Sequence, residues 1–275
     1  MSQRYQHIGP LGRGGFGRIE LFYDSQLEQR VVRKSLMDPT YENCQRLIRE
    51  GEMCIQLSQE VHVVDLLDYK FDYTKPWLMF PYYEAGTLET RVGNRNWYDS
   101  IIYVQNVATG LRAVHGLGGI HRDTKPSNLF VDKRTDGKQF VRVGDFGFGR
   151  LPQPFTSGTM TLHPCGAPDY IAPELYQSNA RFTPSCDIYS LGITGIELIT
   201  GSRKRESINT IWINNDVTTL LLEMTSWTPS KRPDAATVAS RALNIIQTYD
   251  ANFTKVATAG LAGLAAYGLY KLFSE

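Results

Sequence analysis

The chain has 275 residues, which is long enough for one large domain or two modest ones with a substantial buried core. Its 29 Lys and Arg residues nearly balance its 28 Asp and Glu residues, so bulk charge offers no attraction for nucleic acid, and we expect no nucleic-acid partner. The four cysteines form neither a CxxC pair nor a zinc-type cluster, and the amino terminus has no apolar stretch of signal-peptide length, so we expect a cytoplasmic protein.

Residues 1–83 are predicted to form a small, mainly β unit with one helix. Runs of β-branched and aromatic residues predict strands at Arg18–Tyr23, Gln29–Lys34, Val61–Phe71 and Trp77–Phe80. Between the second and third runs, Leu47, Cys54 and Leu57 recur at helical spacing, and Glu50 falls on the same face. A carboxylate that points inward needs a cationic partner, so we expect one to face Glu50.

Two features of this unit suit the binding of phosphate groups. In the segment Gly12-Arg13-Gly14-Gly15-Phe16-Gly17, the glycines let backbone N–H groups approach phosphate oxygens without an intervening side chain. The same glycines also suit a simple hairpin, so the segment alone does not establish a site. Lys34, at the end of a predicted strand, provides an ammonium group that Glu50 would hold in place.

Residues 84–250 have a mostly helical pattern after the break at Gly86. Helices are predicted at Trp97–His115, Asp187–Thr200, Asp216–Met224 and Asp234–Tyr249. The whole chain is therefore predicted to be α+β, with a small mainly-β lobe that carries one main helix and a larger mainly-α lobe.

The second lobe contains the run His121-Arg122-Asp123-Thr124-Lys125-Pro126-Ser127-Asn128, and Asp145-Phe146-Gly147 follows about twenty residues later. Together with the glycine-rich segment, Lys34 and Glu50, these motifs resemble the eukaryotic-type (Hanks-type) serine/threonine protein kinase family. The resemblance extends from about Leu11 to about Arg232. It implies the two-lobed protein kinase fold, protein substrates, and ATP and Mg²⁺ as cofactors.

The resemblance also implies roles for individual residues. Asp123 would be the catalytic base, Lys125 would offset charge at the γ-phosphate, and a lysine at this position is typical of the serine/threonine branch. Asn128 and Asp145 would bind the metal ions. The residues expected to bind or position ATP are Leu11, Gly12, Gly14, Phe16, Gly17, Ile19, Lys34, Glu50, Pro81, Tyr83 and Phe130.

Further motifs match the scaffold of the same family. Ala172-Pro173-Glu174 closes the activation segment that begins at Asp145, and the resemblance implies an ion pair between Glu174 and Arg232. The hydrophobic spine of the family has candidates at Cys54, Leu66, His121 and Phe146.

The chain departs from the family pattern at Val32, which replaces the usual alanine and narrows the adenine pocket, and at further positions that bear on activity and substrate. Ala167 stands where these kinases usually have a threonine that contacts the base, and the interval between Thr200 and Arg232 is short for the family. Ser127 and Thr87 stand where arginine-directed kinases carry acids, which argues against a basic consensus. Two interpretations follow: an active kinase, favoured by the complete catalytic set, and a kinase-fold scaffold or binding module with slow or absent turnover.

Regulation by phosphorylation is a further expectation, because Arg122 precedes the base and in this family often pairs with a phosphate on the activation segment. The candidate acceptors are Thr156, Ser157, Thr159 and Thr161. The alternative is an activation segment that is ordered without phosphate.

The last segment, residues 251–275, contains an uncharged run from Val256 to Tyr270. If Lys271 is included and the run is extended to Phe273, its length is about eighteen residues, the lower limit for crossing a bilayer, so a C-terminal membrane anchor is one interpretation. A helix of this alanine- and glycine-rich composition also suits packing on the second lobe or self-association, and disorder is a third alternative.

Overall fold

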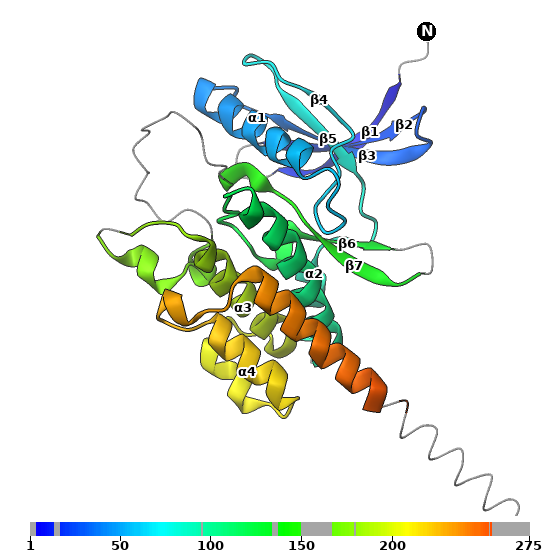
Figure 1. The fold of residues 1–275 in the computed structure, drawn as a ribbon. Helices are drawn as coiled ribbons and strands as arrows, with labels where there is room; N and C mark the ends of the chain where they lie inside the picture. Colours follow the sequence, from blue (N-terminus) through cyan, green and yellow to red (C-terminus); the bar gives the residue numbers. More distant parts are fainter. Residues whose placement is uncertain are drawn as a thin grey trace, which may run out of the picture.

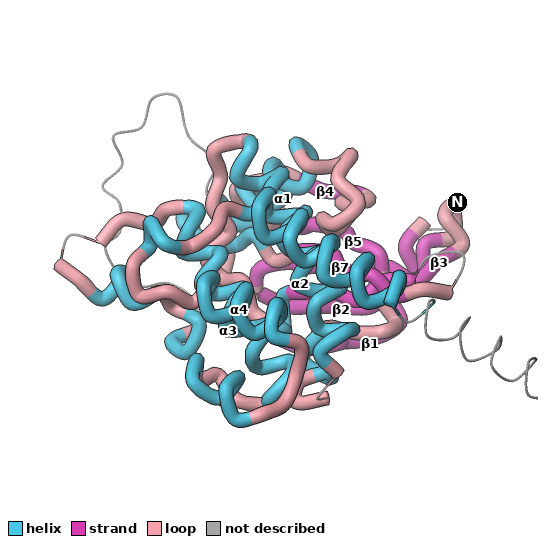
Figure 2. The backbone as a smooth tube through the Cα atoms, turned by 60° about the horizontal axis from the view of Figure 1, so that its bottom comes forward, coloured by secondary structure: helices cyan, strands magenta, loops and turns pink. Residues whose placement is uncertain are grey.

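A computed structural model describes residues 4–13, 17–94, 96–133, 137–149, 167–178, 180–252 and 254. The chain forms two lobes, with a sheet and one long helix above a larger helical body (Figure 1). Strands gather on one side of the molecule and helices on the other (Figure 2). This arrangement confirms the predicted α+β, two-lobed fold.

The first lobe is built on a five-stranded antiparallel sheet of order β1-β2-β3-β5-β4. The strands are β1 (Tyr5–Arg13), β2 (Gly17–Asp24), β3 (Gln29–Leu36), β4 (Asp68–Lys70) and β5 (Trp77–Pro81). Strand β1 was not predicted, because Gly9, Pro10 and Gly12 weaken its pattern, and the pairing with β2 shifts register twice along it.

The predicted strand Val61–Phe71 is wrong over most of its length, because only β4 is extended there. Val63 and Val64 are buried, but they lie in a loop that bonds to the second lobe: the Val64 N–H donates to the Val143 carbonyl at 3.0 Å. Val63 and Val64 therefore pack between the lobes instead of extending the sheet, and Val61 is exposed.

Helix α1 (Tyr41–Gln56) begins at Thr40, whose hydroxyl accepts the Asn43 N–H at 3.3 Å. The helix packs closely on the sheet at Gly51, where an added Cβ would come within 2.7 Å of both Leu78 and Phe71. This close approach turns Glu50, one residue before Gly51, toward the interior, where it is only 2% exposed.

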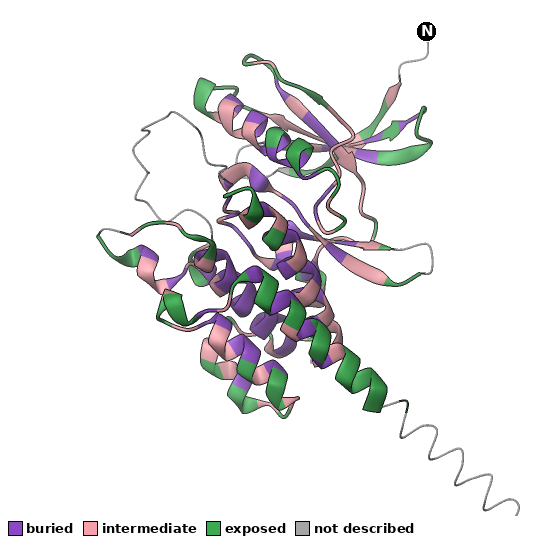
Figure 3. Ribbon diagram, viewed as in Figure 1, coloured by how far each residue is buried: buried purple, intermediate pink, exposed green. Residues whose placement is uncertain are grey.

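The second lobe consists of α2 (Trp97–Gly116), α3 (Pro184–Thr200), α4 (Asn215–Met224) and a last helix over residues 235–252. All four predicted helices are confirmed. Helix α3 is almost wholly buried and forms the centre of this lobe (Figure 3). A hairpin of β6 (Leu129–Lys133) and β7 (Gln139–Val143) lies between the helices and the five-stranded sheet (Figure 1).

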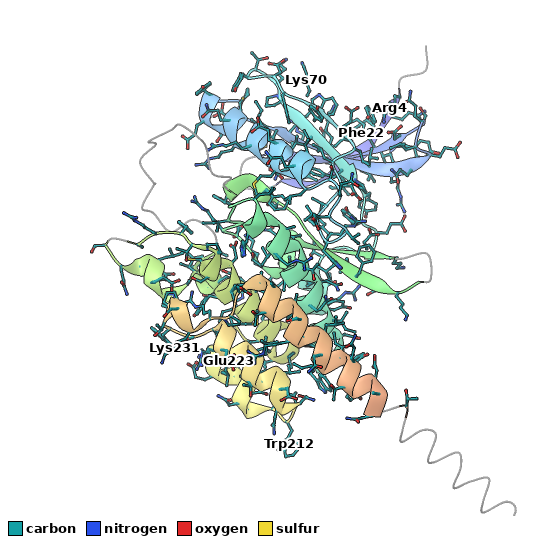
Figure 4. All side chains as sticks on the ribbon, in the orientation of Figure 1. Arg4, Phe22, Lys70, Trp212, Glu223 and Lys231 are labelled. Atoms are coloured by element: carbon teal, nitrogen blue, oxygen red, sulfur yellow. The ribbon has the colours of Figure 1, made fainter. Side chains whose placement is uncertain are left out.

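Short 3₁₀ turns complete the second lobe and carry several of the predicted motifs. They are η1 (Leu88–Arg91), η2 (Pro126–Asn128), η3 (Phe146–Phe148), η4 (Pro168–Tyr170), η5 (Pro173–Tyr176), η6 (Arg205–Thr210) and η7 (Pro229–Lys231). The loop between η6 and α4 carries Trp212, whose side chain is fully exposed and points away from the lobe (Figure 4).

The predicted ion pair between Glu174 and Arg232 is confirmed. Both terminal nitrogens of Arg232 donate to the Glu174 carboxylate, at 2.7 and 2.6 Å, and the Arg232 side chain is completely buried. This bidentate pair fixes η5 against the segment that precedes the last helix.

The predicted membrane anchor lies almost entirely outside the described residues. Within the part of the chain that the structure describes, we find no helix that is both long and apolar enough to cross a bilayer.

Candidate active site

Lys34 lies at the meeting point of the two lobes. It is on β3, paired with Ile19 of β2 and Leu78 of β5, and its Nζ lies 2.8 Å from both carboxylate oxygens of Glu50. The same Nζ lies 2.7 Å from Oδ1 of Asp145, in the second lobe. One ammonium group therefore joins the sheet, helix α1 and the loop after β7, and it is the cation that the inward-facing Glu50 was expected to have.

The three charges shift one another's ionisation. Burial raises the pKa of Glu50 to about 7, and the nearby ammonium opposes that rise. Burial disfavours the charged form of Lys34, but the carboxylates of Glu50 and Asp145 outweigh it and raise the pKa of Lys34 above its ordinary value. Burial likewise disfavours ionised Asp145, yet Lys34 keeps the pKa of Asp145 below its usual range. Two carboxylates face one ammonium, so the cluster can accept a further cation.

Asp123 lies in a strained loop that α3 holds in place. The preceding residue, Arg122, has a left-handed backbone with φ of 71°. The carboxylate of Asp187, at the first turn of α3, accepts the N–H groups of His121 and Arg122, both at 2.8 Å. Nε2 of His115, on α2, lies 2.8 Å from the same carboxylate. Because Asp187 is completely buried, its hydrogen bonds fix the backbone that leads to Asp123.

Sequence reasoning treated Asp187 only as the start of a helix and did not identify His115. A sequence signal exists for Asp187, because an acidic residue in the first turn of an otherwise apolar helix requires buried hydrogen-bond donors. His115 gives no comparable signal, since it lies at the end of α2, 72 residues away from Asp187.

The Asp123 carboxylate has three described donors. Lys125 Nζ and Asn128 Nδ2 both lie 2.8 Å from Oδ2, and the Ala167 N–H lies 3.3 Å from Oδ1. Asn128 Nδ2 also donates to the Asp123 carbonyl at 2.8 Å, so both of its amide hydrogens are used. Oδ1 of Asn128 is thereby left as an acceptor suited to a hard cation.

The residues present fit a magnesium ion that also binds a phosphate-bearing ligand. Among the described residues, no group of three or more His, Cys, Asp or Glu side chains is placed to hold a metal. Magnesium, however, commonly takes only one or two protein oxygens and completes its shell with phosphates and water. Asn128 and Asp145 provide one amide and one carboxylate oxygen of this type.

Phe146 follows Asp145 into the core. Asp145 has a left-handed backbone, with φ of 58°, and Phe146 is fully buried with its ring edge-on to His121 at 5.0 Å between centroids. His121 Nδ1 accepts the Asp123 N–H, so Nε2 carries the proton and donates to the Gly144 carbonyl at 3.0 Å. Cys54 and Leu66 belong to the same apolar core, as the predicted spine requires.

A cavity of about 210 Å³ opens between the two lobes at this cluster. Its lining includes the predicted residues Gly17, Ile19, Lys34, Glu50, Asp123, Lys125 and Asp145. Gly147 and Phe148, which were not predicted, also line it. The structure therefore brings residues from both lobes, including the charged groups of the cluster, to one cavity.

Of the remaining predicted site residues, two fall outside the described parts, and the others do not line this cavity. Leu11 and Gly12 lie on β1, and Gly12 pairs with Ile19. Pro81 ends β5 opposite Val31, and the ring of Tyr83 lies 5.4 Å from that of Phe130 on β6. Gly14 and Phe16 lie outside the described residues, as do the four predicted phosphorylation sites between 156 and 161.

Comparison with known proteins identifies the arrangement. Residues 5–249 match the family model described as the protein kinase domain. The serine/threonine-protein kinase PknK of Mycobacterium tuberculosis (strain ATCC 25618 / H37Rv) is 32% identical over 202 residues, 72% of this chain and 18% of PknK. The serine/threonine-protein kinase Pkn1 of Myxococcus xanthus is 32% identical over 204 residues, 72% of this chain and 29% of Pkn1.

A plant relative matches an equal share of the chain. CBL-interacting serine/threonine-protein kinase 21 of Arabidopsis thaliana is 26% identical over 204 residues, 72% of this chain and 47% of that protein. The chain thus spans less than half the length of each of these curated relatives.

Proposed function

Since this chain belongs to the eukaryotic-type serine/threonine protein kinase family, we propose that it transfers the γ-phosphoryl group of ATP to serine or threonine hydroxyls of protein substrates. The observation that carries the proposal is the contact of Lys34 with both Glu50 and Asp145. That contact joins the lobes above Asp123 and gathers the charges that phosphoryl transfer needs.

The proposed mechanism assigns one task to each group. Lys34, held by Glu50, orients the α- and β-phosphates, and the backbone of β1 and β2 covers them from the first lobe. Magnesium bound through Asn128 and Asp145 would supply positive charge against the phosphate oxygens. Lys125, now paired with Asp123, reaches the γ-phosphate and offsets the charge that develops there.

Asp123 is the proposed general base. Its Oδ2 is held by Lys125 and Asn128, whereas Oδ1 has one long contact among the described residues, the Ala167 N–H at 3.3 Å. Oδ1 is therefore the better placed oxygen to accept the proton of an attacking hydroxyl. The rigid backbone behind Asp123 keeps this oxygen oriented between turnovers.

A catalytically weak scaffold is the second candidate function, and Ala167 is the observation that favours it. The hydrogen bond that a threonine hydroxyl would make here is worth about 1 kcal/mol of free energy, or somewhat more beside charged groups. Ala167 still contributes its backbone N–H to Asp123, and Lys125 and Asn128 hold the other oxygen. These donors support activity as the better proposal.

The same proposal extends to regulation and location. We propose that phosphorylation within residues 156–161 controls activity through Arg122, and phosphatase treatment that left activity unchanged would refute this.

We also propose that the kinase is cytoplasmic and that residues 251–275 provide membrane contact or self-association. Cell fractionation of a fluorescent protein fused to residues 252–275 separates these alternatives: a carbonate-resistant pellet supports membrane insertion, and a soluble fusion refutes it.

The proposed activity is tested by incubating the chain with Mg²⁺, labelled ATP and myelin basic protein, followed by phosphoamino-acid analysis. We expect label on phosphoserine or phosphothreonine, and none with Lys34→Met. A wild-type chain that binds ATP but labels neither itself nor the acceptor would favour the scaffold.

A further inference from the structure

We infer that Arg203 determines substrate specificity: it occupies an acidic site beside the acceptor side of Asp123 and so removes any selection for basic substrates. The inference rests on the proposed phosphoryl transfer, and it names the residue that determines which substrate sequences are accepted. Arg203 lies just after α3, two residues beyond Gly201, whose left-handed backbone (φ 76°) ends that helix.

Arg203 lies between two carboxylates. Its Nε donates to Oε1 of Glu197 at 2.8 Å, and its Nη1 donates to Oδ2 of Asp169 at 2.7 Å. The guanidinium also lies over the ring of Tyr170, 5.3 Å from its centroid, and the Tyr170 hydroxyl donates to the other oxygen of Glu197. Planar guanidinium groups favour this arrangement of two carboxylates over an aromatic face.

Asp169, one of the two carboxylates, lies close along the chain to a residue that contacts the catalytic base. Ala167 donates its N–H to Asp123, and Asp169 is only two residues further along, so their Cα atoms are at most about 7.6 Å apart. Asp123, Ala167 and Tyr170 also line one small cavity in the second lobe. A peptide whose hydroxyl reaches Asp123 therefore has neighbouring residues near Asp169 and Arg203.

The charges and exposures indicate what this site would bind without Arg203. The Asp169 side chain is 59% exposed, whereas that of Glu197 is 5% exposed beneath it. These two anions would then face the acceptor side with a ready-made guanidinium geometry, and an arginine of the substrate is the group that fits. In the wild-type chain Arg203 already occupies this site, because it donates to both carboxylates, and its side chain is half exposed.

Ser127 and Thr87 are uncharged, so these two positions also offer no carboxylate to a basic substrate. With neutral residues there, and with Asp169 and Glu197 both paired with Arg203 here, a substrate arginine would meet no unpaired carboxylate at either place. The proposed kinase should therefore accept neutral or acidic sequences around its serine or threonine as readily as basic ones.

The test uses a positional-scanning library of peptides with a fixed central serine or threonine, in which each flanking position carries Arg, Ala or Asp. The quantity measured is the ratio of kcat/KM for the Arg peptide to that for the Ala peptide, because a ratio cancels a general loss of activity. Wild type should give a ratio near one throughout. Arg203→Ala should raise the ratio at one or two positions, on the order of tenfold, which corresponds to one good charge-assisted pair.

Two further variants separate specificity from structure. Arg203→Met keeps an apolar stem over Tyr170 and should show the same gain of preference as Arg203→Ala. Adding Asp169→Asn to either variant should remove the gain. Lys204→Met is the matched control: it deletes the exposed charge next along the chain and should leave the ratios at their wild-type values.

Several results would overturn the inference. They are a wild-type preference for arginine, ratios in Arg203→Met that equal those of wild type, or loss of all activity in both Arg203 variants while wild type stays active. The last result would make Arg203 a structural support of the 167–170 loop. A wild-type chain inactive on every peptide and on myelin basic protein would instead refute the proposed function itself.

Discussion

The substitution Glu50→Gln tests how much the junction of the lobes depends on one carboxylate. Glutamine keeps the size of the side chain but removes the charge, so both 2.8 Å contacts with Lys34 lose their anionic acceptor. A hydrogen bond to a charged group is worth about 1.5 to 3 kcal/mol. If that energy positions Lys34 on the phosphates, kcat/KM for ATP should fall roughly 10- to 150-fold.

The same variant should fold normally. Burial raises the pKa of Glu50 to about 7, because keeping the buried carboxylate ionised costs folding free energy. A neutral amide avoids that cost. Lys34 keeps Asp145 as a partner at 2.7 Å, so its ammonium is not left unpaired. The free energy of unfolding should therefore change by no more than about 1 kcal/mol.

The assay compares steady-state kinetics with varied ATP, and urea unfolding, for Glu50→Gln and for Glu52→Gln. Glu52 is on the same helix but exposed, so its substitution is a matched control that should leave both quantities unchanged. Wild-type kcat/KM in Glu50→Gln would refute the reasoning, and so would an equal loss in both variants.

Other substitutions test the scaffold. Arg232→Ala should lower the free energy of unfolding by about 3 to 5 kcal/mol, because it removes a buried guanidinium and leaves the partly buried carboxylate of Glu174 without its bidentate partner. Lys231→Ala at an exposed site should leave the free energy of unfolding unchanged, and urea unfolding measures both. Gly51→Ala should cost about 1 to 3 kcal/mol by pushing α1 from the sheet, since the new Cβ would meet neighbours at 2.7 Å; a neutral result would contradict the tight packing. Burial disfavours ionised Asp187, but the hydrogen bond from His115 and the backbone N–H groups keep the pKa of Asp187 below its ordinary value. Its stabilisation is therefore complete above about pH 4 and is lost as pH falls through the lower, folded pKa, so the acid-side decline in unfolding free energy should be shallower in Asp187→Asn.

Local patterns predicted most of the fold because they report on faces that are buried along one element. The periodic apolar residues of α1 and of the second-lobe helices placed those helices correctly. The prediction of a strand at Val61–Phe71 was wrong because Val63 and Val64 are buried within a loop between the lobes, and an apolar run does not distinguish a buried loop from a strand. Strand β1 was missed since glycine and proline interrupt it, although the neighbouring β2 supplies its pairing.

The candidate site was predicted as a set of motifs, and the structure brings most of the described members to one cavity. What the sequence did not contain is the set of contacts between distant residues. His115 and Asp187 hold the backbone before Asp123 from two different helices, and Arg203 reaches Asp169 from beyond the end of α3. Such contacts depend on how helices pack in three dimensions, which a pattern along one chain does not specify.

Single-turnover transfer by the Asp123→Ala variant tests the central claim most directly. The chain is mixed in excess over labelled ATP with Mg²⁺ and myelin basic protein, and ATP binding is measured in parallel by calorimetry. Because the base contacts the acceptor hydroxyl and not the nucleotide, we predict that Asp123→Ala binds ATP nearly as wild type does and transfers no phosphoryl group above background. Transfer by Asp123→Ala at the wild-type rate would contradict the assignment of Asp123 as the base.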